Sequence, residues 1–485
     1  MEIPPWVGWA IFVADYLIRV GLSLRVIMRR RPVGVSLAWL AVILSSPFFG
    51  AFIYLLVGEL RLGNRRARRA SQLGAPFEAW LKDLQHRKLV DWSRQSPASE
   101  PLARLAESTV GAPAMADNAW QLFQESDRTF ESLIRDIDAA QQSCHLEFYI
   151  WQAGGKADEV VAAMVRARQR GVVCRVLLDS VGSKPFFKSA QAAEMLRAGI
   201  ALRAALPASF IRMWFARLDL RMHRKIVVID GQIAYTGSQN LVDPRFFKQE
   251  AGVGEWVDAM VRIEGPSVEA LGVLFLADWE LESEDGIEKL RKSGGVHPLE
   301  PRGAAVIQVV PSGPTSPDRA ILEVLLMAIY SARREVVLTT PYFVPEEALL
   351  TALITAARRG VAVKLIVPAK VDSVLVRLAG QSFRGDLAEA GVEVFEFHGG
   401  LLHTKSVTVD REFSLFGSLN LDPRSLHLNF EITLSIFDAD FTGALRVLQD
   451  SYLTKCRPMD LAAWRRRKLG PKLASNVARL LGPLL

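Results

Sequence analysis

Apolar residues are concentrated at the amino-terminal end of the chain, where they form two long runs. The second run, residues 33–57, contains 25 residues and no charged side chain. Because about 20 consecutive apolar residues suffice to cross a bilayer core, this run predicts a transmembrane helix. Pro47 and Gly50 are expected to kink it, which membrane helices tolerate. A buried helix of a globular domain is the alternative, and the length of the run disfavours it.

The first run, residues 4–27, is apolar but includes Asp15 and Arg19. These residues are four apart, so on a helix they share a face and can pair, which lowers the cost of placing charge in a membrane. We expect this run to cross the membrane as the first arm of a transmembrane helical hairpin over residues 1–60. The alternative is an amphipathic helix that lies partly in the interface.

Arginines flank the second run and indicate its orientation. Residues 29–31 are all arginine, and a larger group follows the run: Arg61, Arg65, Arg66, Arg68 and Arg69. Since the larger basic group belongs on the cytoplasmic side, the rest of the chain is expected to be cytoplasmic.

From about residue 116 onward, strand-like and helix-like patterns alternate. The order strand, amphipathic helix, strand occurs twice, at residues 143–151, 157–171 and 172–182 and again at 334–343, 346–360 and 361–370. This order predicts an α/β fold, and its return predicts a duplication. We expect a linker with a short helix at 61–115, a first half at 116–300 and a second half at 301–485.

The charge and cysteine content of the chain restrict the kinds of ligand that it is expected to bind. The 485 residues include 59 Lys and Arg against 52 Asp and Glu, a formal net charge of +7. This excess favours an anionic partner, which nucleic acid, a phosphorylated ligand and an anionic membrane all provide. The three cysteines, Cys144, Cys174 and Cys456, show no C-x-x-C spacing. Neither a disulfide framework nor a zinc site is therefore indicated.

One short pattern of ionisable residues occurs twice, once in each expected half. The pattern H-x-K-x-x-x-x-D consists of His223, Lys225 and Asp230 in one copy and of His403, Lys405 and Asp410 in the other. In both copies a G-S-x-N sequence begins fourteen residues after the histidine. A single copy would more often be a structural histidine beside a surface lysine. Two copies with the same trailing sequence exclude coincidence.

The spacing of this pattern suits phosphodiester chemistry. On a strand, residues two apart share a face, so each histidine and lysine project together, while each aspartate falls at a hairpin end. The serines and asparagines of G-S-x-N offer hydrogen bonds to an anionic oxygen; they are Ser238, Asn240, Ser418 and Asn420. With two copies face to face, one histidine can attack phosphorus and the other can protonate the leaving oxygen. The lysines would stabilise the developing charge without a metal or other cofactor.

Two carboxylates are candidates for orienting the histidines. Glu431 follows the second motif in the segment NFEITLSIFD, and the corresponding segment of the first half offers Asp258. The stretch from the histidine to the acid is seven residues longer in the first half than in the second, with an apparent insertion around FFKQEAG. The alternative is that both acids are ordinary surface carboxylates.

The duplicated motif resembles the signature of the phospholipase D superfamily. The two apolar runs and the segments around both motifs are also similar to bacterial cardiolipin synthases of the A type, over nearly the whole chain. This resemblance implies two similar α/β sandwich halves with the active site at their interface. It implies transfer of a phosphatidyl group between two phosphatidylglycerols through a phosphatidyl-histidine intermediate, giving cardiolipin and glycerol at a bacterial inner membrane. By motif it assigns the six histidine, lysine and aspartate residues to catalysis and the G-S-x-N residues to phosphate contact.

Two further segments suit a membrane substrate. Residues 210–221 interleave aromatic residues with arginines, and the carboxy-terminal segment from residue 463 is basic and partly amphipathic. Both are expected to lie on anionic lipid, and the alternative for each is an ordinary surface helix.

Nucleic acid is not the expected partner. The other activities that remain open are a phospholipase D-type hydrolase or metal-independent nuclease of the same superfamily, and a non-catalytic lipid-binding protein, which the two intact motifs disfavour.

Overall fold

The computed structural model describes residues 4–29, 33–59, 62–87, 90–207, 217, 219–283, 285–286, 289–290, 293, 295–317 and 319–480. It contains two compact units: Met1–Arg68 with Ala208–Leu220, and Arg69–Pro207 with Arg221–Leu485. Most of the aromatic and basic segment 210–221 lies outside the described residues.

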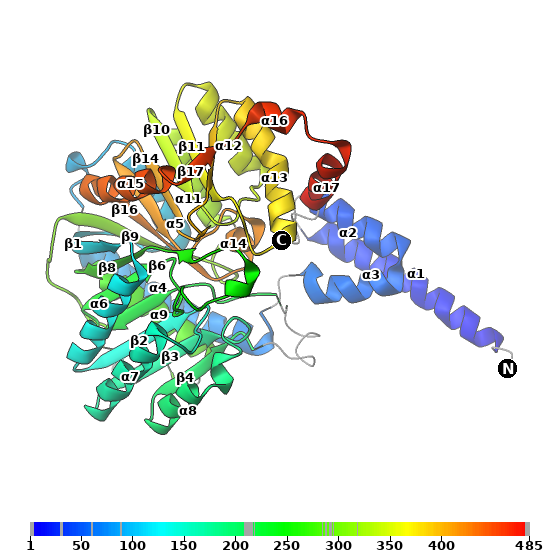
Figure 1. Cartoon of the computed structure of the whole chain (residues 1–485). Helices are drawn as coiled ribbons and strands as arrows, with labels where there is room; N and C mark the ends of the chain where they lie inside the picture. Colours follow the sequence, from blue (N-terminus) through cyan, green and yellow to red (C-terminus); the bar gives the residue numbers. More distant parts are fainter. Residues whose placement is uncertain are drawn as a thin grey trace. The chain divides into compact units, whose positions relative to one another are not determined.

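The amino-terminal unit consists of packed helices, drawn in blue in Figure 1. They are α1 (Pro5–Met28), α2 (Val33–Ser45), α3 (Pro47–Ile53) and a π-helical turn (Tyr54–Gly58). Pro47 begins a new helix, because proline lacks the N–H that would continue the preceding one. A Cβ added at Gly50 would lie 2.7 Å from the Val42 carbonyl oxygen, so the backbone of α3 folds back against α2. The expected kink is therefore a complete break.

Among the residues that the structure describes, no single helix is both long and apolar enough to cross a bilayer. The predicted ion pair is present in α1, where Arg19 Nε lies 2.7 Å from Asp15 Oδ2.

The segment expected to be a linker is largely helical. It contains α4 (Asn64–Arg87) and α5 (Ser99–Val110). Only the second of these was expected. The α5 helix ends at Gly111, which adopts a left-handed conformation with φ +77°, as is common at helix ends.

The larger unit is built on one sheet of 15 strands with two matching parts. The first half contributes β1 (Ala114–Phe123), β2 (Ser143–Phe148), β3 (Val173–Asp179), β4 (Ala201–Ala205), β5 (Ile226–Ile229), β6 (Ile233–Gly237) and β8 (Met260–Glu264). The second contributes β9 (Ala305–Ser312), β10 (Glu335–Thr339), β11 (Ala362–Pro368), β12 (Glu393–Phe397), β14 (Ser406–Val409), β15 (Phe413–Gly417), β16 (Glu431–Phe437) and β17 (Cys456–Pro458).

The strand order confirms the predicted duplication. It is β1-β8-β6-β5-β2-β3-β4 in the first half and β9-β16-β15-β14-β10-β11-β12-β17 in the second. Each of the first seven positions therefore repeats, and the halves join where β1 and β9 pair antiparallel. The central strands β2, β5 and β16 are buried along their whole length. Burial on both faces agrees with the continuous apolar sequence of β5, IVVI.

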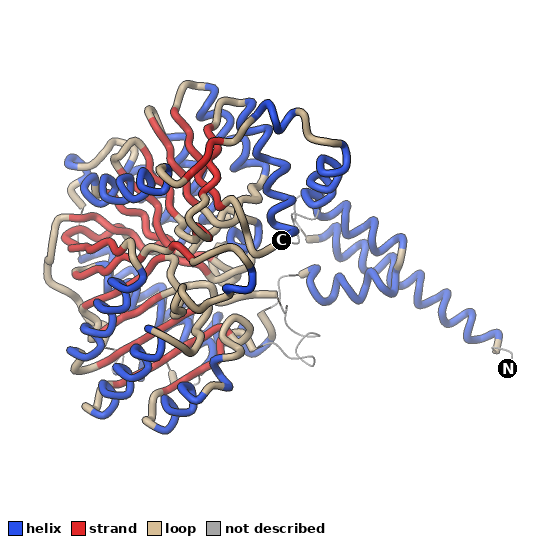
Figure 2. The backbone as a smooth tube through the Cα atoms, viewed as in Figure 1, coloured by secondary structure: helices blue, strands red, loops and turns tan. Residues whose placement is uncertain are grey.

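Helices cover the sheet and connect its parallel strands, as Figures 1 and 2 show. The first half has α6 (Ser126–Ala139), α7 (Lys156–Gln169), α8 (Ala190–Arg197) and α9 (Ser267–Glu282). The second has α11 (Ala320–Ser331), α12 (Glu347–Arg358), α13 (Val374–Glu389), α14 (Pro423–His427) and α15 (Ala439–Leu453), then α16 (Leu461–Arg465) and α17 (Leu469–Leu480). The expected α/β architecture is therefore present in both halves.

Arg224, between the histidine and lysine of the first motif, ties the two halves together. Its guanidinium donates to the backbone oxygens of Glu431 at 3.0 Å and Ser312 at 3.2 Å, both in the second half. It also pairs with Asp278 of α9, and both side chains are almost fully buried. Burial and the neighbouring Asp278 charge hold the pKa of Glu147 well above its usual range, so Glu147 is neutral. The positive charge of Arg224 is then matched by the single negative charge of Asp278.

Replacing Arg224 with Met should lower the free energy of unfolding by about 3–5 kcal/mol, because Asp278 would remain as an unpaired buried charge. Urea unfolding of the detergent-solubilised full chain measures this. The control is Arg411→Met: Arg411 pairs with Glu335 at the surface, with 56% of its own side chain exposed, and its loss should cost about 1 kcal/mol or less. Equal losses in the two variants would contradict a structural role for the buried pair.

Candidate active site

Both motifs lie at the entrance to a central strand of their half. His223 and Lys225 directly precede β5, and His403 and Lys405 directly precede β14. These residues were expected within the strands; instead they occupy the extended segment just before each strand begins. His223 and His403 are 7% and 2% exposed.

Each histidine is held by a carboxylate of the other half. His223 Nδ1 lies 2.8 Å from Glu431 Oε2, and His403 Nδ1 lies 2.6 Å from Asp258 Oδ1. The backbone makes the same kind of contact between the halves. The His223 N–H donates to the Phe430 oxygen, and the His403 N–H donates to the Val257 oxygen. Each histidine therefore binds two consecutive residues of the opposite half, which fixes both the position and the rotation of its ring.

The G-S-x-N serines lie behind these carboxylates. The Ser238 hydroxyl donates to Asp258 at 2.6 Å, and the Ser418 hydroxyl donates to Glu431 at 2.5 Å. Both serines are fully buried. Their hydroxyl protons are engaged by the acids, and the phosphate contact expected of Ser238 and Ser418 stays a prediction. We therefore infer that they orient the acids, which in turn orient the histidines.

The two asparagines retain unused hydrogen-bonding capacity. Asn240 Oδ1 accepts from the Ile150 N–H at 3.1 Å, but within the described residues its Nδ2 has no partner. Asn420 Oδ1 is likewise buried without a partner among the described residues. An unmade buried hydrogen bond costs about 1–3 kcal/mol, so these amides suit a polar ligand. Phosphate contact by Asn240 and Asn420 stays a prediction.

Both lysines are buried beside their histidines. Lys225 Nζ donates to the His223 carbonyl oxygen at 2.6 Å, and Lys405 Nζ donates to the His403 carbonyl oxygen at 2.5 Å. Burial lowers the pKa of Lys225 to about 8, against the opposing effect of nearby carboxylates. Burial also holds the pKa of Lys405 well below its usual range. An ammonium group has three donors, so each lysine can also donate to an anionic oxygen.

The imidazoles are neutral near pH 7. Burial lowers the pKa of both His223 and His403 to about 4, although the paired carboxylates act in the opposite direction. Burial alone would raise the pKa of Asp258, but the charges of His403 and Lys405 and its hydrogen bonds outweigh it and lower that pKa to about 2. Because Nδ1 donates to the carboxylate, Nε2 carries the free lone pair in each ring.

The motif aspartates bind backbone amides rather than the histidines, and the catalytic role expected of Asp230 and Asp410 stays a prediction. The Asp230 carboxylate accepts from the backbone N–H groups of residues 141–143 at 2.7–2.8 Å. The Asp410 carboxylate accepts from those of residues 333–335 at the same distances. Both aspartates adopt φ +53° at a hairpin end, a conformation that Asp tolerates better than most residues. Their role is to hold the loop that leads into β2 or β10.

Two aromatic residues next to the histidines were not anticipated from the sequence. The Tyr149 ring lies 4.9 Å from the His223 ring, and the Trp256 ring lies 4.3 Å from the His403 ring, between centroids. Trp256 comes two residues before Asp258, and this proximity to a candidate acid is the sequence feature that could have indicated its place in the site.

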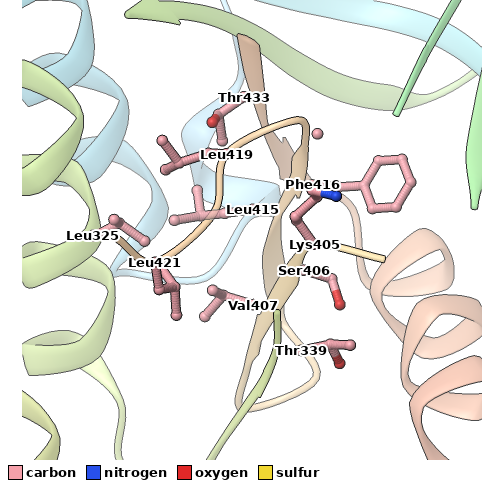
Figure 3. A pocket seen from close by; sticks show the side chains of 11 residues that line it. Leu325, Thr339, Lys405, Ser406, Val407, Leu415, Phe416, Leu419, Leu421 and Thr433 are labelled. Carbon is pink, nitrogen blue, oxygen red and sulfur yellow. The ribbon is translucent and has the colours of Figure 1, made fainter. Parts of the chain in front are cut away.

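A small pocket lies beside Lys405 (Figure 3). Its volume is about 20 Å³, which is about the space that one water molecule requires. Apolar side chains such as Leu325, Leu415 and Leu421 line it, together with Thr339 and Thr433. It is too small for a phosphate group, so it belongs to the packing behind the site.

Comparisons with known proteins agree with this geometry. A family model described as "Cardiolipin synthase, PLD-like domain" matches residues 133–267 and 325–450, and one described as "Phospholipase_D-nuclease N-terminal" matches residues 19–59. Cardiolipin synthase A of Citrobacter koseri and that of Klebsiella pneumoniae are each 45% identical to this chain over 479 residues, which is 99% of both chains. The crystal structure of a phosphatidylserine synthase from Haemophilus influenzae shares the fold, with a TM-score of 0.60 at 15% identity, and covers 79% of this chain and 100% of that chain.

The imidazole resonances of His223 and His403 should titrate near pH 4 in the ligand-free protein. In Glu431→Gln the pKa of His223 should fall further, because that carboxylate's charge raises it. NMR of histidine-labelled protein measures this, with the exposed Glu389→Gln as the control. Since unfolded imidazoles take up protons below about pH 6.5, these groups reduce stability as the pH falls from there toward 4. Titration of both near 6.5 would contradict the lowered pKa of the two imidazoles.

Proposed function

Since the chain belongs to the cardiolipin synthase family of phospholipase D-like proteins, we propose that it transfers a phosphatidyl group from one phosphatidylglycerol to another, giving cardiolipin and glycerol. It is an enzyme of the phosphatidyltransferase class. The observation that carries the specific proposal is the exchanged pair of histidine–carboxylate contacts, His223 with Glu431 and His403 with Asp258.

The first step forms a phosphatidyl-histidine. The Nε2 lone pair of one imidazole attacks phosphorus, and the bond between phosphorus and the glycerol oxygen breaks. The second imidazole, protonated at Nε2, gives its proton to the departing glycerol oxygen. The negative charge of the bound phosphodiester favours that protonated state. Lys225 and Lys405 stabilise the charge on the non-bridging oxygens.

The second step reverses the first with a different alcohol. A hydroxyl of another phosphatidylglycerol attacks phosphorus, and its proton passes to the second imidazole. The phosphorus–nitrogen bond breaks and the first histidine returns to its neutral state. One phosphodiester replaces another, so the energy of the bond is conserved and no nucleotide is consumed.

We also propose that the amino-terminal unit attaches the enzyme to a bacterial inner membrane. Its helices expose large apolar side chains, and Trp6 and Trp9 are 71% and 70% exposed. Aromatic residues of this kind are typical of membrane interfaces. The specific form of the proposal is a helical hairpin that crosses the membrane, with both catalytic halves on the cytoplasmic side where the larger arginine group lies.

The carboxy-terminal helix α17 supports contact with anionic lipid. Four apolar residues spaced three or four apart along it are at least half exposed: Leu469, Leu473, Val477 and Leu480. They form one stripe on the helix, and the exposed Lys468 and Lys472 accompany it. An apolar stripe beside basic residues suits a surface of anionic phospholipid.

The purified full chain, mixed with phosphatidylglycerol vesicles and a chelator, should produce cardiolipin and glycerol. Lipid analysis by mass spectrometry separates the alternatives. Phosphatidic acid alone would indicate a hydrolase, and cleavage of nucleic acid without lipid turnover would indicate a nuclease; either result would refute transfer.

His223→Ala and His403→Ala should each lower kcat by at least about a thousandfold, and the double variant should be no worse, because the two groups act as a unit. The control is His398→Ala, which removes an exposed histidine outside the site. Substantial transfer by either single variant would refute the two-histidine mechanism.

A further inference from the structure

An insertion distinguishes the first half from the second near the active site. The segment from Asn240 to Asp258 is seven residues longer than the corresponding segment from Asn420 to Glu431. The additional residues fall within residues 244–255, which we call the insertion loop. Its sequence, PRFFKQEAGVGE, contains two phenylalanines, one lysine and two glycines.

The insertion loop is fastened to the second half by its backbone. The Leu401 N–H donates to the Glu255 oxygen at 2.9 Å, and β7 (Trp256–Val257) pairs in parallel with β13 (Leu401–Leu402). A Cβ added at Gly254 would lie 3.0 Å from the Gly400 Cα, and Gly254 has φ +80°. Glycine is therefore needed where the two chains approach.

A side-chain contact fastens the loop a second time. Lys248 Nζ lies 3.2 Å from Asp372 Oδ2 of the second half, and Asp372 also accepts from the Tyr342 hydroxyl at 2.7 Å. The same ammonium lies 5.6 Å from the Trp256 ring centroid, within the range of a cation–π interaction.

These attachments place an apolar wall beside His403. Trp256 contacts the His403 ring, and Phe247 packs edge-on against Trp256 at 4.9 Å between centroids. The cluster around them also includes Ile150, Val242, Val253 and Leu401. In the second half the position two residues before the acid is Asn429, whose amide donates to Glu431 at 3.3 Å.

Trp256 also has a hydrogen-bond donor that the protein leaves unused. The side chain is 6% exposed, and its buried Nε1 has no partner among the described residues. A buried donor without a partner is costly. Beside a reacting imidazole, such a donor is available to an oxygen of the substrate.

We propose that the insertion loop makes the His403 side of the site specific for a lipid alcohol rather than water, with Trp256 as the specificity-determining residue. Its indole N–H donates to an oxygen of the acceptor's glycerol headgroup, and the apolar cluster excludes water. This inference rests on the proposed phosphatidyl transfer. In the second step the acceptor oxygen bonds to phosphorus, its proton passes to His403 Nε2, and the bond from phosphorus to His223 Nε2 breaks. Water in the acceptor's place would instead yield phosphatidic acid.

The test measures the ratio of cardiolipin to phosphatidic acid formed by the full chain from phosphatidylglycerol vesicles. Trp256→Ala removes both wall and donor, and the ratio should fall at least tenfold. Trp256→Phe keeps the wall, so the ratio should change less, while kcat/KM should fall about tenfold through the lost hydrogen bond. Lys248→Met releases one attachment, and the ratio should fall about threefold.

Phe246→Ala is the matched control, because Phe246 belongs to the same loop but is 65% exposed; it should leave the ratio and rate unchanged. A wild-type ratio in Trp256→Ala would overturn the inference, as would a wild-type ratio in Lys248→Met if the first variant does not fold. Unchanged kcat/KM in Trp256→Phe would overturn the role of the indole N–H. A wild-type enzyme that forms no cardiolipin would refute the proposed transfer itself, which is a different result from an unmoved ratio.

Discussion

Everything at the catalytic centre depends on the exchange of hydrogen bonds between imidazole and carboxylate across the two halves. Glu431 holds His223, and Asp258 holds His403. Neither half therefore contains a complete histidine–acid pair, and either histidine would lose its orientation if the halves separated. The antiparallel join of β1 and β9 and the buried Arg224 contacts serve this requirement. They fix the distance between two motifs that lie far apart in the chain.

The duplicated fold and its motifs could be predicted from the sequence, whereas the contacts between the two halves could not. The repeated β-α-β order and the repeated motif were sufficient for the α/β duplication, because both depend on local periodicity and spacing. The crossed pairing was not predictable from Glu431 and Asp258 alone, since each follows a histidine of its own half. The contacts of Asp230 were not predictable for a related reason: it lies at a hairpin end and binds loop amides, and spacing alone does not separate a catalytic residue from a structural one. The fold-back at Pro47 and Gly50 depended on a close backbone approach that hydropathy does not register.

The two halves differ at the residues that neighbour the duplicated motifs. Arg224 in the first motif corresponds to Thr404 in the second, and Thr404 makes neutral hydrogen bonds to the Val257 oxygen and the Tyr452 hydroxyl. Trp256 likewise corresponds to Asn429. The histidine, lysine, serine and asparagine of the motifs are the same in both halves, whereas the orienting acids, Asp258 and Glu431, and the neighbouring residues differ. Such a difference lets the site treat the two sides of phosphorus differently, which a fully symmetric site would not do.

Burial explains how this site can supply both a nucleophile and an acid. Burial lowers the pKa of both imidazoles and both lysines, so the site resists positive charge and keeps a lone pair on each Nε2. A phosphodiester brings the negative charge that the site lacks, and opposite charge at short range favours protonation. The proton for the departing glycerol is therefore most readily held when a substrate is bound. In an exposed site, water would screen this coupling and also compete as acceptor. The same burial thus links protonation to substrate binding and favours transfer over hydrolysis.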